Sequence, residues 1–77
     1  MKKFYLLKAP INYKISVYYE YVYDANIPVI ENIAVVSSDI HLKYLKSLGY
    51  KLICELELPD NLTPKQVIEA YKEAVKS

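Results

Sequence analysis

The chain has 77 residues and a formal net charge of +1; 53% of its residues are apolar and 25% are charged. This ordinary globular composition excludes a disordered chain and a coiled coil. The single cysteine cannot form an internal disulfide, and with the single histidine it makes no ligand pair at metal-binding spacing, so neither a metal nor another cofactor is expected.

All ten basic residues are lysine. Because arginine supplies the planar fork that reads guanine and phosphate edges, its absence counts against sequence-specific nucleic-acid binding. The N-terminal apolar run FYLL is too short for a signal peptide or a membrane span, so we expect a cytoplasmic protein without membrane contact. We expect one domain over residues 1–77, and self-association is the simplest supplement to so small a core.

Residues 3–9 are expected to form the first strand, ended by the turn residues Pro10 and Asn12. The next strand, residues 13–23, reads YKISVYYEYVY and holds five of the nine tyrosines. Because side chains alternate between the two faces of a strand, its odd positions share one face. The pattern predicts that this face is buried, with its first residues in the core; its members are Tyr13, Ile15, Val17, Tyr19, Tyr21 and Tyr23.

Residues 24–28, DANIP, are expected to form a hairpin connection, since Asp and Asn tolerate turn geometry. Pro28 cannot donate to a strand ladder, which places it at a strand start or edge. A third strand, VIENIAVV, is then predicted over residues 29–36.

Ser37 or Ser38 is suited to cap a helix over residues 39–48, and Gly49 is suited to end that helix in a left-handed conformation. On a helical wheel the apolar stripe consists of Ile40, His41, Tyr44, Leu45 and Leu48.

Residues 50–58 alternate clearly and predict a fourth strand, with the inward face formed by Tyr50, Leu52, Cys54, Leu56 and Leu58. The last helix is expected to begin at Pro64, where Thr63 and Gln66 have the spacing of a capping box.

The expected order is β-β-β-α-β-α. Short connections favour an antiparallel meander for the first three strands, and the helix between the third and fourth favours a parallel pair. We therefore predict an α+β two-layer sandwich: a four-stranded mixed sheet with both helices on one face.

No residue pattern supports catalysis, and we expect no enzyme. His41 falls within an apolar stripe, where histidine is more often a packed side chain, and the serines before it are explained as caps. Cys54 alternates with leucines and is expected to be a small buried hydrophobe. Glu55 and Glu57 are expected to be solvated or to protect a sheet edge.

The function that we expect is assembly: a homodimer formed through the long tyrosine-rich strand, with a further surface for another protein. Tyrosine is enriched at protein interfaces. The interface residues that we expect to meet across a two-fold axis are Tyr19, Tyr21 and Tyr23.

The alternative is a single-stranded nucleic-acid-binding protein, in which tyrosine rings stack on bases and lysines follow the backbone. The contacts would then come from Tyr18, Lys14 and Lys8. Against it, a near-neutral chain builds no strong electrostatic attraction for phosphate.

Lysines balanced by acidic residues, with a single glycine, are also trends of heat-adapted proteins, whereas the four asparagines point in the opposite direction.

Overall fold

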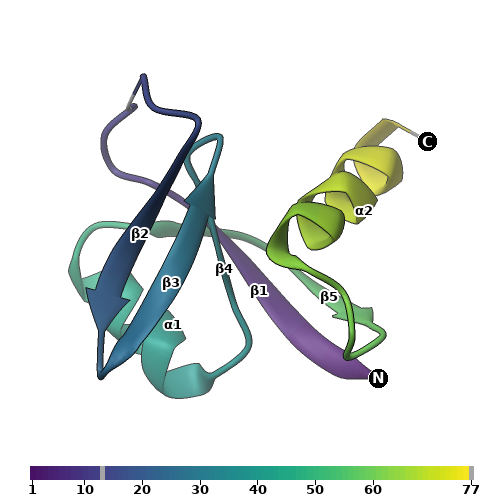
Figure 1. The fold of residues 1–77 in the computed structure, drawn as a ribbon, viewed down its shortest axis with the longest axis horizontal. Coiled ribbons are helices and arrows are strands. Elements are labelled where there is room, and N and C mark those ends of the chain that lie inside the picture. The colour runs from purple at the N-terminus through teal and green to yellow at the C-terminus, as the bar shows by residue number, and fades with distance from the viewer. Residues whose placement is uncertain (13, 77) are drawn as a thin grey trace.

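A computed structural model describes residues 1–12 and 14–76 of the chain. Its elements in chain order are β1 (Lys2–Lys8), β2 (Val17–Val22), β3 (Ala25–Ile30), β4 (Ile33–Val36), α1 (Asp39–Ser47), β5 (Lys51–Leu58) and α2 (Pro64–Lys76), as Figure 1 shows. The strands form a five-stranded sheet in the order β2-β3-β4-β1-β5, and all neighbouring pairs are antiparallel. The protein is therefore α+β.

Two tight hairpins build one half of the sheet. Residues 23–24 join β2 to β3 and residues 31–32 join β3 to β4, and these four residues have φ values of 47°, 59°, 52° and 65°. Two left-handed residues in a two-residue loop define a type I′ turn. The single strand predicted over residues 29–36 is therefore divided in two. Neither turn contains glycine, which is the usual sequence signal for this geometry.

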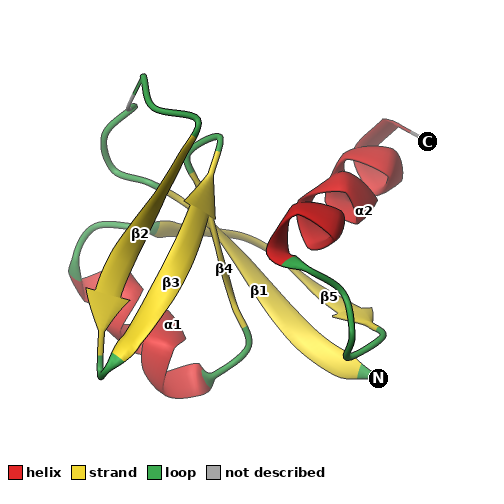
Figure 2. Ribbon diagram, viewed as in Figure 1, coloured by secondary structure: helices red, strands yellow, loops and turns green. Residues whose placement is uncertain are grey.

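The predicted parallel pairing on either side of α1 is also absent. β1 lies between β4 and β5 and is antiparallel to both (Figure 2). β4 and β5 consequently run in the same direction, but they are not hydrogen-bonded neighbours. The prediction of a four-stranded mixed sheet is wrong because β1 lies between β4 and β5.

The helices pack on opposite faces of the sheet, not on one face as expected. β1 lies at the centre of both cores: its odd residues cluster with α1 and its even residues cluster with α2. The first cluster includes Tyr5, Leu7, Val29, Leu45 and Tyr50, and the second includes Phe4, Leu6, Val35, Val67 and Ile68. A strand buried on both faces reads as a continuous apolar run, as FYLL does.

The odd face of β2 does not belong to either core, which corrects the prediction that it is buried. Its exposed fractions are 45%, 64% and 65% for Val17, Tyr19 and Tyr21. Ile15, which precedes the strand, is exposed as well, and Tyr13 lies outside the described residues. The even residues Tyr18 and Val22 pack on the core beside α1 instead. Only one face of this edge strand is covered, and it is the face with fewer apolar residues.

A β-bulge in β5 changes which face its even residues occupy. Leu52 is opposite Leu7 on the α1 side, whereas Cys54 is opposite Leu6 on the α2 side, and the register shifts between these pairs. The inward face predicted for residues 50–58 is therefore not a single face, because a bulge inserts one extra residue into the alternation. Tyr50 belongs to the core beside α1, Leu52 is exposed, and Cys54, Leu56 and Leu58 pack on the core beside α2.

The helix ends follow local sequence more closely. At the start of α2 the backbone N–H of Thr63 donates to Gln66 Oε1 at 2.9 Å, and the N–H of Gln66 donates to Thr63 Oγ1 at 3.2 Å. This confirms the capping box. Ser38 is the N-cap of α1, although its side chain makes no capping hydrogen bond.

The packing face of α1 differs from the predicted stripe. Leu45 is fully buried and Leu42 is packed beside it, whereas Ile40 and Leu48 are exposed. A helix of nine residues makes few turns, so a small rotation about its axis is enough to bury Leu42 and to expose Ile40.

Candidate functional site

β2 is an edge strand whose outer backbone is free for pairing. In the β2–β3 hairpin, Val22 and Ala25 flank the two-residue turn and form a hydrogen-bonded pair, so the even residues of β2 direct their backbone groups towards β3. The odd residues Val17, Tyr19 and Tyr21 direct their N–H and C=O groups away from the sheet. The same three residues have the exposed side chains described above, and we call them the β2 tyrosine face.

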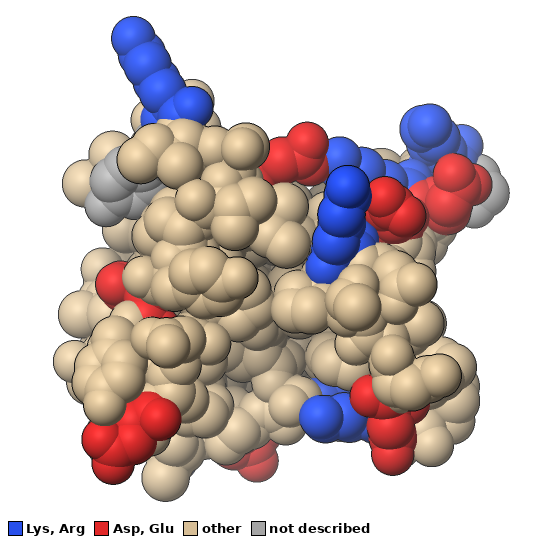
Figure 3. Space-filling model, in the orientation of Figure 1, with Lys and Arg blue, Asp and Glu red and all other residues tan. Residues whose placement is uncertain are grey.

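The β2 tyrosine face contains no charged residue, and the charged side chain beside it is Asp24, whose Oδ1 accepts a hydrogen bond from the Tyr21 hydroxyl. Figure 3 shows that the region over β2 and β3 is largely uncharged in this view, while charged side chains gather over α2 and at the periphery. Glu20, the charged residue of β2, lies on the other face of the strand, where its Oε1 accepts a hydrogen bond of 3.4 Å from the Tyr50 hydroxyl.

Tyr23 is separated from the other two predicted interface tyrosines. It lies in the left-handed turn after β2, and its ring packs on α1. The ring makes an edge contact with Tyr44 at a centroid distance of 5.2 Å and lies 6.4 Å from the ring of His41. The structure thus brings Tyr19 and Tyr21 together and places Tyr23 on a different surface.

The residues of the nucleic-acid alternative do not form one surface. Tyr18 is partly buried against the core beside α1. Lys8 is opposite Ile33, which belongs to the core on the α2 side, so Lys8 and Tyr18 occupy opposite faces of the sheet. Lys14 is exposed in the segment before β2.

Tyr18, Glu20 and Tyr50 form a partly buried polar cluster under the edge strand. The hydroxyls of Tyr18 and Tyr50 are hydrogen-bonded at 3.0 Å. Burial, followed by this hydrogen bond and the nearby charge of Glu20, raises the pKa of Tyr50 far above its ordinary value. Tyr50 therefore stays neutral in the folded protein at pH values that ionise an exposed tyrosine.

This cluster makes stability sensitive to alkaline pH. Because the folded-state pKa of Tyr50 is raised, its contribution to the free energy of unfolding is fully present below pH ~10, the ordinary pKa of tyrosine. That contribution is lost as the pH rises above ~10, because the unfolded chain then releases a proton that the folded chain keeps. Urea denaturation between pH 7 and 11 is expected to show a decline that is shallower in Tyr50→Phe. The control Val75→Ala, which changes no titratable group at an exposed position, is expected to follow the parent, and an identical decline in all three proteins would contradict this assignment.

A gap in the sheet separates β3 from β4. Their ladder consists of only two residue pairs, Val29 with Ala34 and Ile30 with Ile33, next to the turn. Beyond it the strands diverge (Figure 1), because Pro28 offers no N–H to continue the ladder and β4 turns to pair with β1.

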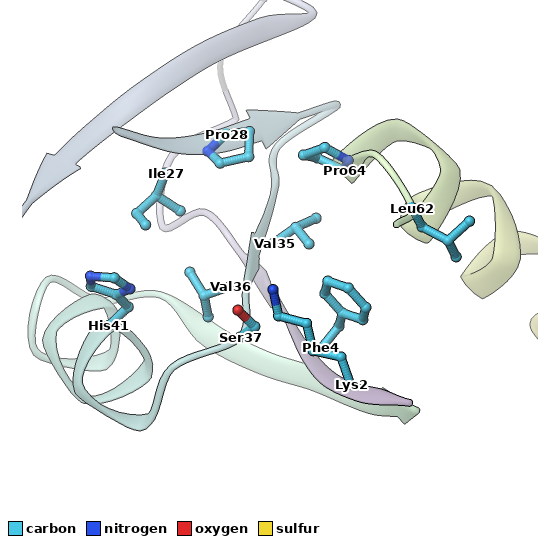
Figure 4. A pocket seen from close by; sticks show the side chains of 10 residues that line it. All are labelled: Lys2, Phe4, Ile27, Pro28, Val35, Val36, Ser37, His41, Leu62 and Pro64. Atoms are coloured by element: carbon cyan, nitrogen blue, oxygen red, sulfur yellow. The ribbon is translucent and has the colours of Figure 1, made fainter. Parts of the chain in front are cut away.

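The gap opens into a cavity of about 290 Å³. Its walls come from β1, β3, β4, α1, the start of α2 and the segments before both helices, and both faces of the sheet contribute. The lining residues are Lys2, Phe4, Ile27, Pro28, Val35, Val36, Ser37, His41, Leu62 and Pro64 (Figure 4).

Seven of these residues are apolar, and the other three are Lys2, Ser37 and His41. Figure 4 shows the ammonium group of Lys2 reaching back over the cavity towards Ser37 and Phe4, with His41 on the far side. The Lys2 Nζ lies 5.6 Å from the centroid of the Phe4 ring. Lys2 is the only lysine, aspartate or glutamate that lines the cavity among the residues that the structure describes.

His41 is not joined to an acid within residues 1–12 and 14–76. Asp39, the nearest acid in sequence, instead accepts a hydrogen bond of 2.8 Å from the Tyr5 hydroxyl, which raises the pKa of Tyr5. Burial also raises the pKa of the Cys54 thiol, which favours its unreactive neutral form. Glu55 and Glu57 are exposed on the edge strand β5.

The described residues contain no cluster of three or more His, Cys, Asp and Glu side chains that could hold a metal ion. Neither helix in the described part of the chain has the length and apolar character needed to cross a membrane.

Comparisons with protein-family models, with curated protein sequences and with solved structures found no match for this chain.

The cavity was not anticipated because its residues come from remote segments that no local pattern connects. Pro28 was the one available signal: a proline within a strand indicates an interrupted ladder. Lys2 and Pro64 come to line the same cavity only through the pairing of β1 with β5 and the return of the chain into α2.

Proposed function

We propose that this protein is a self-assembly module in which β2 of one copy pairs antiparallel with β2 of a second copy. The observation that carries this proposal is that the free backbone edge and the exposed rings coincide on the β2 tyrosine face. An edge strand of this kind is a template for another strand unless something protects it.

The two edges of the sheet differ in their protection. β5, at one edge, has a bulge and the exposed charges of Lys51, Glu55 and Glu57, all of which discourage further pairing. β2, at the other edge, reads VYYEYV and contains no bulge, lysine or proline. Strand addition is therefore favoured at β2 and opposed at β5.

A two-fold axis at Tyr19 gives the pairing a definite register. Tyr19 would lie opposite its own mate, and Val17 would lie opposite Tyr21 of the second copy. These residues direct their backbone groups outward, so each pair could exchange two hydrogen bonds. Cross-strand aromatic pairs and aromatic pairs with β-branched residues stabilise such ladders. The Tyr21 hydroxyl already donates to Asp24 at 2.9 Å, which leaves its ring available for contact.

The proposal is tested by measuring mass in solution by sedimentation across a protein titration. Tyr19→Lys places two ammonium groups opposite each other across the axis and is expected to raise the dimer dissociation constant at least about tenfold. Tyr23→Lys makes the same change in the turn, outside the β2 tyrosine face, and is expected to leave the constant within about twofold.

Amide hydrogen exchange then locates the interface. The N–H groups of Tyr19 and Tyr21 are expected to be protected in the dimer and to exchange rapidly in Tyr19→Lys. A single-chain mass at millimolar concentration, or a dimer in which these two amides exchange freely, would refute the proposal. A dimer weakened equally by Tyr23→Lys would also count against it.

A further inference from the structure

We infer that the cavity between β3 and β4 is a binding site for a small aromatic carboxylate. This site is distinct from the β2 edge and does not depend on the proposed assembly.

The cavity has the size of a small-ligand site. Its volume of about 290 Å³ is at the lower end of the range of ~300–1,000 Å³ for ligand pockets, which suits a molecule with one ring. Such sites combine a mostly apolar lining with a few polar groups that fix the ligand's orientation, and this one combines seven apolar residues with Lys2, Ser37 and His41.

The wall favours a flat ring. It includes the ring of Phe4 and the pyrrolidine rings of Pro28 and Pro64, which approach the cavity from β1, β3 and the start of α2. Aromatic ligands pack on such surfaces through offset or edge contacts. Since β3 and β4 diverge here, a ring can enter between them without displacing a pair of the ladder.

The charge of the site favours a monoanion. Lys2 provides one ammonium group, and no carboxylate of a described residue lines the cavity to neutralise it. Ser37 and His41 can add hydrogen bonds to the ligand. The positive charge of the nearby Met1 amino group is already balanced by Asp60, whose Oδ1 lies 3.8 Å from it. A carboxylate beside Lys2 would form a charge-assisted hydrogen bond.

The test is a titration of the labelled protein with phenylacetate, followed by the amide signals in two-dimensional NMR at constant ionic strength. Saturable shifts are expected at Val35, Val36, Ser37 and His41. Phenylacetamide, which has nearly the same shape without the charge, is expected to bind about fivefold to tenfold more weakly.

Two pairs of variants separate charge from shape. Lys2→Gln is expected to reduce phenylacetate affinity to that of phenylacetamide, whereas Lys3→Gln, on the neighbouring residue outside the cavity, is expected to change it less than twofold. Ser37→Trp is expected to block both compounds, and the matched control Ser47→Trp, at the end of α1, is expected to block neither. The NMR spectra also report whether each variant is folded.

The inference is overturned if phenylacetate causes no saturable shift up to about 10 mM, if it binds no better than phenylacetamide, or if the shifts lie outside the cavity. Tyr19→Lys is expected to bind phenylacetate as the parent does. Ligand binding and assembly can therefore fail separately.

Discussion

Leu45→Ala is expected to lower the free energy of unfolding by about 2–5 kcal/mol. Leu45 is fully buried, and it is the residue by which α1 is anchored in the cluster that contains Leu7, Val29 and Tyr50. Truncation removes its burial from water and leaves a cavity that a short helix cannot close. A chain of this length is stabilised by about 4–12 kcal/mol in total, so the loss is a large part of its stability.

The measurement is urea denaturation followed by circular dichroism at one protein concentration, because assembly would add to apparent stability. Val75→Ala is the control: Val75 is 65% exposed on α2, and its truncation is expected to cost less than about 0.5 kcal/mol. Ile68→Ala, in the other core, should also cost about 2–5 kcal/mol. A cost below about 1 kcal/mol for Leu45→Ala would show that α1 is not packed on the sheet as described.

Gly49→Ala is expected to cost about 1–3 kcal/mol. Gly49 ends α1 with φ at 103°, where L-residues are strained, and an added Cβ would lie 3.2 Å from the Cβ of Pro10. The turn is held by hydrogen bonds from the N–H of Gly49 to the C=O of Lys46 at 3.1 Å and from that of Tyr50 to the C=O of Leu45 at 3.0 Å. This is a Schellman motif, and it directs Tyr50 into the core.

Strain and local packing can be separated by chemical synthesis of the chain with D-alanine at position 49. D-alanine adopts positive φ without strain and directs its methyl group away from the L position, so it is expected to retain most of the parent's stability. Lys43→Ala, on the exposed side of the same helix, provides the surface control. Equal losses for L- and D-alanine would mean that the backbone conformation is not the cause.

The candidate sites were predictable to different degrees. Tyr19 and Tyr21 stood out because a dense run of tyrosines is visible without a structure. The separation of Tyr23 from Tyr19 and Tyr21 could not be predicted. The turn that contains Tyr23 lacks glycine, so in sequence it looks like a continuation of the alternating strand. The cavity could not be predicted from any segment, because Lys2, Val35 and Pro64 line one cavity only after the sheet has formed.

Local sequence was enough to predict the α+β class, the capping box at Thr63 and the left-handed end of α1 at Gly49. It also placed strands at residues 3–9 and 50–58, within one residue of the bounds of β1 and β5. Each of these acts through atoms a few residues apart, so its signal is contained in a short window. Strand order, the placement of the helices and the exposure of the β2 tyrosine face were decided by the tertiary structure. A strand with apolar residues on one face shows which residues could be buried, but the neighbour that covers them comes from elsewhere in the chain. Here α1 packs under the even residues of β2, and the odd face is left to solvent.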